Sequence, residues 1–366
     1  MPVSHPTHDP LLTSLASALA AHGSWAGALL ERLRDKGLAH DHVRLCGTGV
    51  LARIPKQSQM HLGAVDNLAY QKACFERAAP GGHAPRLFGV LPPGGFLPRG
   101  ALLVEDIVGH NAALPADLGL IVQALASIHG LPLPMAAQRH PLIDAPDPLL
   151  ALHDEIADQS QHLAAARLDS RVAAVIAQEI ASLQTACAGL KRPPRHLIAF
   201  DGHPGNFIVR EGGEGVGKSV REAVLVDLEK CRYSYPGLDL AHATLYTSTT
   251  WDLDSHAVLS LQQVTGAYKT WADSMDRTAA EAARPWHVPL RRAMWLWSIT
   301  WCAKWRVLSA APAPVSPDGE DWSAALSGDA LIRHVRGRVD HYLSPAVVGQ
   351  VREEFELLDA ALNGMA

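Results

Sequence analysis

A group of polar side chains in the middle of the sequence could do chemistry together. Asp201 and Asn206 lie five positions apart in IAFDGHPGNFIV, and Asp227 and Glu229 close the apolar run AVLVDLE. If the two stretches pair as a hairpin, carboxylate and amide oxygens converge at its ends. Such oxygens suit Mg²⁺, which also keeps waters and substrate phosphates as ligands. A remaining carboxylate can orient a hydroxyl group and accept its proton, as in phosphoryl transfer.

A simpler alternative is that Asp201 and Asn206 only shape a turn, since the residues between them include Gly and Pro. That alternative explains the loop. It does not explain why Asp-x4-Asn is followed by strand, turn, strand and a second Asp, so the pattern favours a site.

The stretch GGEGVGKS at 212–219 matches the G-x-x-x-x-G-K-S pattern of a nucleotide-binding P-loop. A P-loop needs a helix directly after it, because the helix N-terminus binds the phosphates. Here the run Val224-Leu225-Val226 predicts a strand instead. We therefore expect a hairpin turn at this position, and a P-loop nucleotide hydrolase is a rival function that rests on these residues alone.

The elements that must position these residues divide the chain into two parts. A small α+β part is expected over residues 1–105, and a larger, mostly helical part with one inserted hairpin over 106–366. Helical patterns cover 11–35 (broken near Gly23), 65–79, 118–130, 147–189, 240–310 and 329–363. Strands are expected at 42–45, 49–54, 86–91 and 101–104, and in a hairpin within 196–228.

The composition is that of an ordinary globular protein. The chain has 366 residues, 48% of them hydrophobic, and a formal net charge of -5. No Lys/Arg-rich run stands out, so we expect no nucleic-acid partner. The five cysteines form no C-x-x-C pair and support neither a zinc site nor a disulfide framework. Without a signal-peptide core or a membrane-length apolar run, we expect a cytoplasmic protein with no membrane partner. The oligomeric state is left open.

The central motifs resemble a known family. FDGHPGN resembles the H-G-D-x-H-P-G-N loop of aminoglycoside phosphotransferases and related small-molecule kinases, and VDLEK and PGLDLA resemble their I-D-[FW]-E and P-x-x-D-L-A segments. The resemblance implies a bilobal, protein-kinase-like α+β fold, with an antiparallel sheet in the small N-terminal lobe and a larger helical C-terminal lobe. It implies that Asp201 is the catalytic base and that Asn206 and Asp227 are Mg²⁺ ligands. It also implies that Asp239 is a buried carboxylate supporting the loop.

The resemblance extends to nucleotide binding in the N-terminal part. ALLVEDIVG resembles the hinge strand, whose backbone around Glu105 and Ile107 would hydrogen-bond adenine. VLARIPK resembles the strand whose cation neutralises the phosphates; Arg53 aligns best and Lys56 is the alternative. KGLAHDHVRL resembles a degenerate phosphate loop in which only Gly37 carries over. The cofactors implied are ATP, with GTP as an alternative donor, and Mg²⁺.

Several positions depart from the family pattern. Ala199 stands where the family usually has His, and Phe200 where it has Gly. In the phosphate loop, His40 replaces Asn. Gln71 stands where a Glu would pair with the strand cation; it can hydrogen-bond Arg53 but forms no ion pair. These departures favour an alternative, a nucleotide-binding pseudokinase without turnover.

The acceptor is expected to bind on the helical part. Trp297, Trp301 and Trp305 recur every four residues and share a helix face. They are either core residues or an aromatic wall for a cationic acceptor. Asp252 and Asp254 either attract an amine or cap a turn.

The function expected is therefore ATP- and Mg²⁺-dependent transfer of the γ-phosphate to a hydroxyl group of a small molecule, aminoglycoside-like or a related metabolite. A choline- or ethanolamine-type amino-alcohol kinase is the alternative with the same chemistry.

Overall fold

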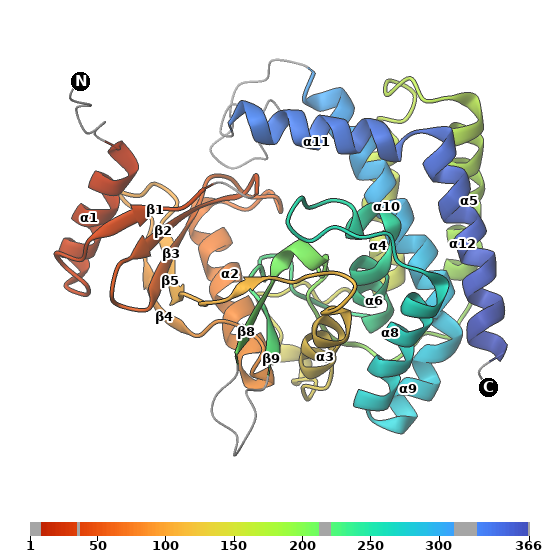
Figure 1. Cartoon of the computed structure of the whole chain (residues 1–366), viewed down its shortest axis with the longest axis horizontal. Helices are drawn as coiled ribbons and strands as arrows, with labels where there is room; N and C mark the ends of the chain where they lie inside the picture. The colour runs from red at the N-terminus through yellow and green to blue at the C-terminus, as the bar shows by residue number, and fades with distance from the viewer. Residues whose placement is uncertain (1–8, 35–36, 212–220, 311–327, 365–366) are drawn as a thin grey trace. The chain divides into compact units, whose positions relative to one another are not determined.

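The computed structural model describes residues 9–34, 37–211, 221–310 and 328–364 (Figure 1). The chain divides into two compact units. Of the described residues, the first unit contains those up to 72, together with 85–107 and 328–332. The second contains 73–84, those from 108 to 310, and those from 333 onward.

The first unit is built on a five-stranded sheet with the strand order β1-β2-β3-β5-β4. Each neighbouring pair is antiparallel, and the register sets Arg53 opposite His42 on one side and Leu102 on the other. The strands are β1 (Leu30–Arg32), β2 (His40–Leu45), β3 (Val50–Pro55), β4 (Leu87–Leu91) and β5 (Ala101–Glu105). The expected strands β2 to β5 are confirmed.

Helix α1 (Pro10–His22) packs its buried residues Leu15 and Leu19 into the apolar cluster of this sheet. The Asp9 carboxylate accepts the Leu11 N–H at 2.9 Å and caps the start of the helix. Gly23 ends it with φ 78°, a left-handed conformation that costs glycine little. The helix expected to continue toward residue 35 was wrong, because the chain after Gly23 turns and forms β1 instead.

The second unit is mostly helical, and α2 (Ala64–Ala78) contributes its last turns to it. Its helices are α3 (Leu118–His129), α4 (Pro148–Ser160), α5 (Ser170–Ala188), α6 (Pro236–Thr244), α7 (Tyr246–Thr249), α8 (Leu261–Ser274), α9 (Arg277–Ala283), α10 (His287–Leu308), α11 (Asp329–Tyr342) and α12 (Pro345–Gly364). The helical stretches expected over 147–189 and 240–310 are interrupted, since residues 161–169 and 251–260 are not helical. No helix among the described residues is long and apolar enough to span a bilayer.

Helix α10 forms the centre of this unit and packs against α4, α5 and α6. Its residues Met294, Trp295 and Ile299 are fully buried. The buried Arg291 guanidinium donates to the Thr244 hydroxyl at 2.6 Å and pairs with Glu354 of α12. The helical body therefore gives the site a rigid support.

Two small sheets complete the second unit: β7 (His196–Ile198) with β10 (Arg232–Ser234), and β6 (His110–Asn111) with β8 (Phe207–Glu211) and β9 (Arg221–Leu225). The expected hairpin is the β8–β9 pair. The expectation that it begins at 196 was wrong, because β7 pairs with β10 instead.

The P-loop-like stretch 212–219 lies outside the described residues. The chain that follows it is strand β9, as expected, and not a helix.

Candidate active site

The loop after β7 carries Asp201, and its shape is set by Asp239 of α6. The buried Asp239 carboxylate accepts the N–H groups of Ala199 and Phe200, each at 2.7 Å. Phe200 has φ 62°, a left-handed conformation. This explains why a glycine is usual at its position, since an L-residue pays a steric cost there. Asp239 offsets that cost by holding both neighbouring amides.

A buried chain of hydrogen bonds extends this support into the helices. His129, at the end of α3, lies 2.9 Å from Asp239 through Nε2, and the Trp271 indole N–H donates to His129 Nδ1 at 2.9 Å. Because Nδ1 is the acceptor, Nε2 carries the proton that Asp239 accepts. His129 is thus a hydrogen-bonded support of the loop. Its place at the end of a helix did not show this, because its partner lies 110 residues away.

Asp201 is held by a lysine that the motifs did not single out. The Lys230 ammonium donates to Asp201 Oδ2 at 2.7 Å. The other oxygen, Oδ1, lies 3.7 Å from His242 Nδ1 and 4.0 Å from His203 Nε2. Lys230 stands at the end of the quoted segment VDLEK, but the I-D-[FW]-E pattern that this segment resembles ends one residue earlier.

Asp201 and Lys230 each shift the pKa of the other toward the charged form. Burial is the largest single effect and by itself would raise the pKa of Asp201, but the Lys230 ammonium, together with His203 and His242, outweighs it and lowers that pKa below its usual value. Burial likewise opposes the charged form of Lys230, but the carboxylates of Asp201, Glu229 and Asp227 raise the pKa of Lys230 to about 12. Both partners are therefore ionised at neutral pH, and Asp201 is in the form that can accept a proton.

Asn206 and Asp227 are brought together by the β8–β9 pairing. The Val226 N–H donates to the Asn206 carbonyl at 2.9 Å, one step beyond the last paired residues of the two strands. The Asn206 side-chain nitrogen donates to the Asp201 carbonyl at 2.9 Å. Because its nitrogen is used in this way, the amide oxygen of Asn206 is the end available to a cation.

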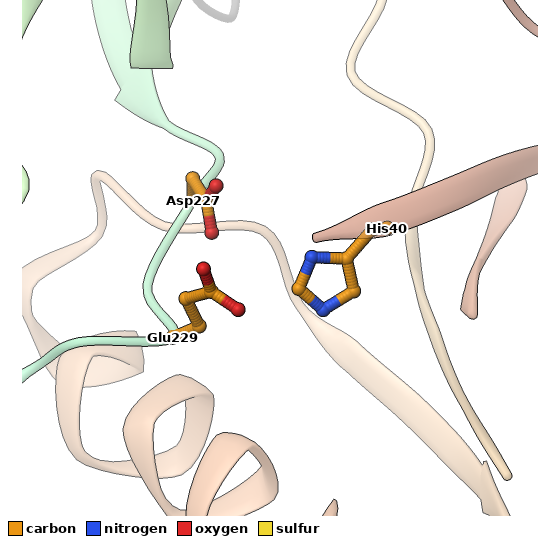
Figure 2. Close-up of side chains that lie close together, drawn as sticks. All are labelled: His40, Asp227 and Glu229. Carbon is orange, nitrogen blue, oxygen red and sulfur yellow. The ribbon is translucent and has the colours of Figure 1, made fainter. Parts of the chain in front are cut away.

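Asp227 and Glu229 lie on the segment that follows β9, and Figure 2 shows both side chains. Their nearest ligand oxygens are within 4.8 Å of each other. Two carboxylates and one amide oxygen form a hard donor set of the kind that Mg²⁺ prefers. The residues of this unit thus fit a divalent cation.

In the first unit, the expected phosphate-binding cation is buried in the sheet. Arg53 on β3 is 3% exposed, and its Nη2 lies 3.5 Å from His40 Nδ1. His40 Nε2 lies 3.0 Å from Gln71 Oε1. His40, labelled in Figure 2 at the start of β2, therefore links Gln71 to Arg53. A comparison of Gln71 only with the Glu that the family has at this position does not show the link through His40.

The two other expected nucleotide-binding segments also belong to the first unit. Gly37 accepts a 3.4 Å hydrogen bond from Lys56 through its carbonyl. At the end of β5, the N–H of Glu105 donates to Arg86 and that of Asp106 donates to Gly49. Within the described residues, the N–H of Ile107 donates to no backbone carbonyl, so it is the amide of this segment that an adenine ring could use.

The tryptophans of α10 do not share one role. Trp305 is 2% exposed and belongs to the core. Trp297 is half-buried, donates to Glu155 at 3.0 Å and meets the Phe200 ring edge-on with the centroids 5.1 Å apart. Trp301 meets the Trp251 ring at 5.9 Å. Of the two alternatives for these tryptophans, core packing is therefore confirmed for Trp305.

The acidic pair after α7 has local partners. Asp252 accepts the N–H groups of Asp254 and Ser255, at 2.7 and 3.2 Å, as a turn-capping residue does. Asp254 accepts a 2.9 Å hydrogen bond from the Asn111 side chain. Asp252 also packs against Gly205 of the Asp201 loop, where an added Cβ would come within 2.8 Å of Asp252 Oδ2. Asp252 thus packs against the same loop whose start Asp239 holds.

Comparison with known proteins finds a matching family. Residues 36–279 match the phosphotransferase enzyme family. No curated protein matches the sequence.

Solved structures with a similar fold share little sequence with the chain. A choline/ethanolamine kinase family protein from Mesorhizobium loti is 18% identical, with a TM-score of 0.58 over 94% of this chain and 99% of its own. An ethanolamine kinase from Plasmodium vivax is 13% identical, with a TM-score of 0.56 over 89% and 83%. An aminoglycoside 2'-phosphotransferase solved with GDP is 13% identical, with a TM-score of 0.55 over 91% and 99%. The expected protein-kinase-like fold is confirmed.

Proposed function

Because the chain belongs to the phosphotransferase enzyme family, we propose that it transfers the γ-phosphate of ATP to a hydroxyl group of a small molecule, with Mg²⁺ as cofactor. The observation that carries this proposal is the ionised Asp201 carboxylate, held one hydrogen bond from Asn206, which the β8–β9 pairing joins to Asp227. A carboxylate base next to hard oxygen donors is the arrangement that phosphoryl transfer to a hydroxyl needs.

Residues of the first unit are proposed to bind the nucleotide. The Ile107 amide would donate to the adenine ring, and the carbonyl of Glu105 lies in the same segment. Arg53 would bind phosphate oxygens through its guanidinium, which can donate two parallel hydrogen bonds. Gly37 would let the backbone approach the phosphates, because it has no side chain and the space beside it is open: no atom lies within 4 Å of the place where a Cβ would stand.

Residues of the second unit are proposed to carry out the transfer. The Asn206 amide oxygen and the Asp227 carboxylate would hold the cation, with Glu229 beside them. A bound Mg²⁺ would offset negative charge on the phosphates. Asp201 would orient the acceptor hydroxyl and accept its proton while the oxygen attacks phosphorus and the bond to the leaving ADP breaks.

The acceptor is proposed to be a small hydroxylated molecule, and GTP is the alternative donor. An amino alcohol is a second candidate, because Trp251, half-buried, gathers the rings of Trp301, His334 and Tyr342 within 6.3 Å. Aromatic faces attract alkylammonium groups. A pseudokinase is disfavoured, because Asp201, Asn206 and Asp227 are all present.

Two substitutions separate the proposed roles. Asp201→Asn should all but abolish transfer, leaving a trace that is measurable at high enzyme concentration, and keep Mg-ATP binding, since an amide keeps the shape but accepts no proton. Asp227→Asn should weaken binding of Mg-ATP, because an amide is a poorer Mg²⁺ ligand than a carboxylate. Calorimetric titration of Mg-ATP, with a phosphate-transfer screen of sugars, amino sugars and amino alcohols, measures both. Loss of binding in Asp201→Asn together with full activity in Asp227→Asn would overturn the assignment. A wild type that binds Mg-ATP but phosphorylates nothing would favour the pseudokinase.

A further inference from the structure

Lys230 is half-buried beside the proposed base, and the reaction described above gives it no role. We propose that Lys230 is a positioning residue for phosphate transfer: its ammonium holds Oδ2 of Asp201, so that Oδ1 is presented to the acceptor hydroxyl. This role rests on the proposed function, because it acts through Asp201.

The two oxygens of Asp201 have different surroundings. Oδ2 accepts the 2.7 Å hydrogen bond from Lys230. Oδ1 has two imidazoles nearby, at 3.7 and 4.0 Å, and both distances exceed that of an ordinary hydrogen bond. Among the described residues, no donor forms a hydrogen bond with Oδ1. This oxygen is therefore the one that can accept a hydrogen bond from a hydroxyl group.

A carboxylate needs a fixed partner to present one chosen oxygen. Asp201 can rotate about its side-chain bonds, and such rotation exchanges Oδ1 with Oδ2. The charge-assisted bond from Lys230 opposes that exchange, since it is shorter and stronger than a bond between neutral groups. The His242 imidazole gives no equivalent charge, because burial lowers the pKa of His242 to about 4 and leaves this ring neutral.

The lysine is itself held by an aromatic and ionic cluster. Its Nζ lies 6.0 Å from the centroid of the Trp297 ring, within the range of a cation–π contact. Trp297 is fixed by its hydrogen bond to Glu155 and by its edge-on contact with Phe200. Glu155 also binds Arg232, whose guanidinium lies 3.6 Å from the Phe200 ring centroid.

This cluster connects Lys230 to the loop that carries Asp201. Phe200 directly precedes Asp201, so the ring that packs against Trp297 and Arg232 also fixes the start of the catalytic loop. The side chain of Lys230 is 15% exposed and that of Asp201 is 17% exposed. Water competes little for the pair, and the ammonium therefore holds the carboxylate more tightly than a surface lysine would.

The test compares Lys230→Met and Lys230→Gln with Lys269→Met, a control on α8 whose exposed lysine pairs with Asp273. Both Lys230 variants should lose about 100-fold in kcat, the usual scale of general-base catalysis. Their KM for the nucleotide should stay within about twofold, and Lys230→Arg should recover about tenfold in kcat. A merely structural role would lower the melting temperature and change KM together with kcat.

A double mutant shows whether Lys230 acts through Asp201. In the Asp201→Asn background, Lys230→Met should cause less than about a twofold further loss, because there is no carboxylate left to position. Independent, multiplicative losses would overturn the proposal, and so would full kcat in folded Lys230→Gln. If wild type transfers phosphate to no acceptor, the proposed function fails and this role fails with it. If wild type is active and the Lys230 variants are too, only this role fails.

Discussion

Phe200 combines a strained, left-handed backbone conformation with a fully buried aromatic ring. The residue is 1% exposed and has φ 62°. Replacing Phe by Ala should cost about 3–5 kcal/mol of unfolding free energy through the lost ring. Phe200→Gly should cost about 1 kcal/mol less than Phe200→Ala, because Gly relieves the left-handed strain that Ala keeps. Urea unfolding of the two variants measures the difference.

Phe207 supplies a matched control, since it is fully buried but has φ -115°. Phe207→Gly should be about 0.5–1 kcal/mol less stable to unfolding than Phe207→Ala. In an extended backbone there is no strain for Gly to relieve, so only its greater loss of conformational entropy remains. The same order of stability at both positions would contradict the strain at Phe200.

Arg53 of β3 and Lys56, the residue directly after this strand, should differ in their effect on nucleotide binding. Arg53→Ala should weaken Mg-ATP binding about tenfold or more, while Lys56→Ala should change it by less than about twofold. Arg53 can bind phosphate oxygens with a planar fork of donors, whereas Lys56 is a half-buried point charge bound to the Gly37 carbonyl. Calorimetry of both folded variants checks the order. Equal and negligible effects would remove the strand cation from the mechanism.

Among the elements, the N-terminus of α10 should make stability depend on pH. Burial, helped by the Arg284 charge, lowers the pKa of His287 to about 4. In the unfolded chain His287 is protonated below about pH 6.5, whereas in the folded chain it stays neutral until the pH approaches 4. The stability contributed by neutral His287 is therefore lost as the pH falls from about 6.5 toward 4. Lowering the pH from 7.5 to 5.5 should therefore reduce the free energy of unfolding by about 1 kcal/mol through this histidine.

Urea unfolding at the two pH values measures this loss. His287→Phe should reduce the pH-dependent loss by about 1 kcal/mol, whereas His256→Gln, at an exposed position, should leave it unchanged. An unchanged pH dependence in His287→Phe would show that this ring is protonated in the folded state.

The β8–β9 hairpin makes a prediction about the P-loop-like stretch. Lys218→Ala should leave nucleotide affinity within about twofold, because the chain continues into β9 and offers the phosphates no helix N-terminus. Fluorescent-nucleotide titration measures the affinity. A tenfold loss, about 1.4 kcal/mol, would favour a P-loop.

Strands β2 to β5 and most helices could be predicted from the sequence, because their apolar periodicity is local. β1 could not, since it has three residues and continues an apparently helical run. The β7–β10 pairing joins segments separated by two other strands, and no local pattern records such a pairing.

Site residues, too, could be predicted only where a local sequence pattern marks them. Asp201, Asn206 and Asp227 stand in motifs with fixed spacing, so they could be proposed as site residues. Lys230 and Glu155 could not, because their roles come from side-chain contacts made only after folding. His40 was read as a lost phosphate-loop residue, and its link between Arg53 and Gln71 depends on the register of β2 with β3.

At the scale of the whole molecule, bound nucleotide should stabilise the fold only together with the metal. Mg-ATP at about 100 times its Kd should add about 2.7 kcal/mol to the unfolding free energy and raise the melting temperature by several degrees. ATP with excess EDTA should give a much smaller shift. Asp227→Asn should lose most of the metal-dependent part, while Asp201→Asn keeps it. A thermal-melting series over these conditions tests metal linkage without any acceptor.

The β8–β9 register also has a consequence for engineering. The strands stay paired out to Glu211 and Arg221, and Arg210 pairs with Glu222 at 2.7 Å, so the hairpin is fixed next to its tip. Asn206 and Asp227 lie at the opposite end. Lengthening a loop between fixed ends costs little, about 0.6 kcal/mol for each doubling. The connection between Glu211 and Arg221 is therefore a place to graft a reporter domain or an affinity tag, and a series of grafts of increasing length should retain the catalytic rate of the parent.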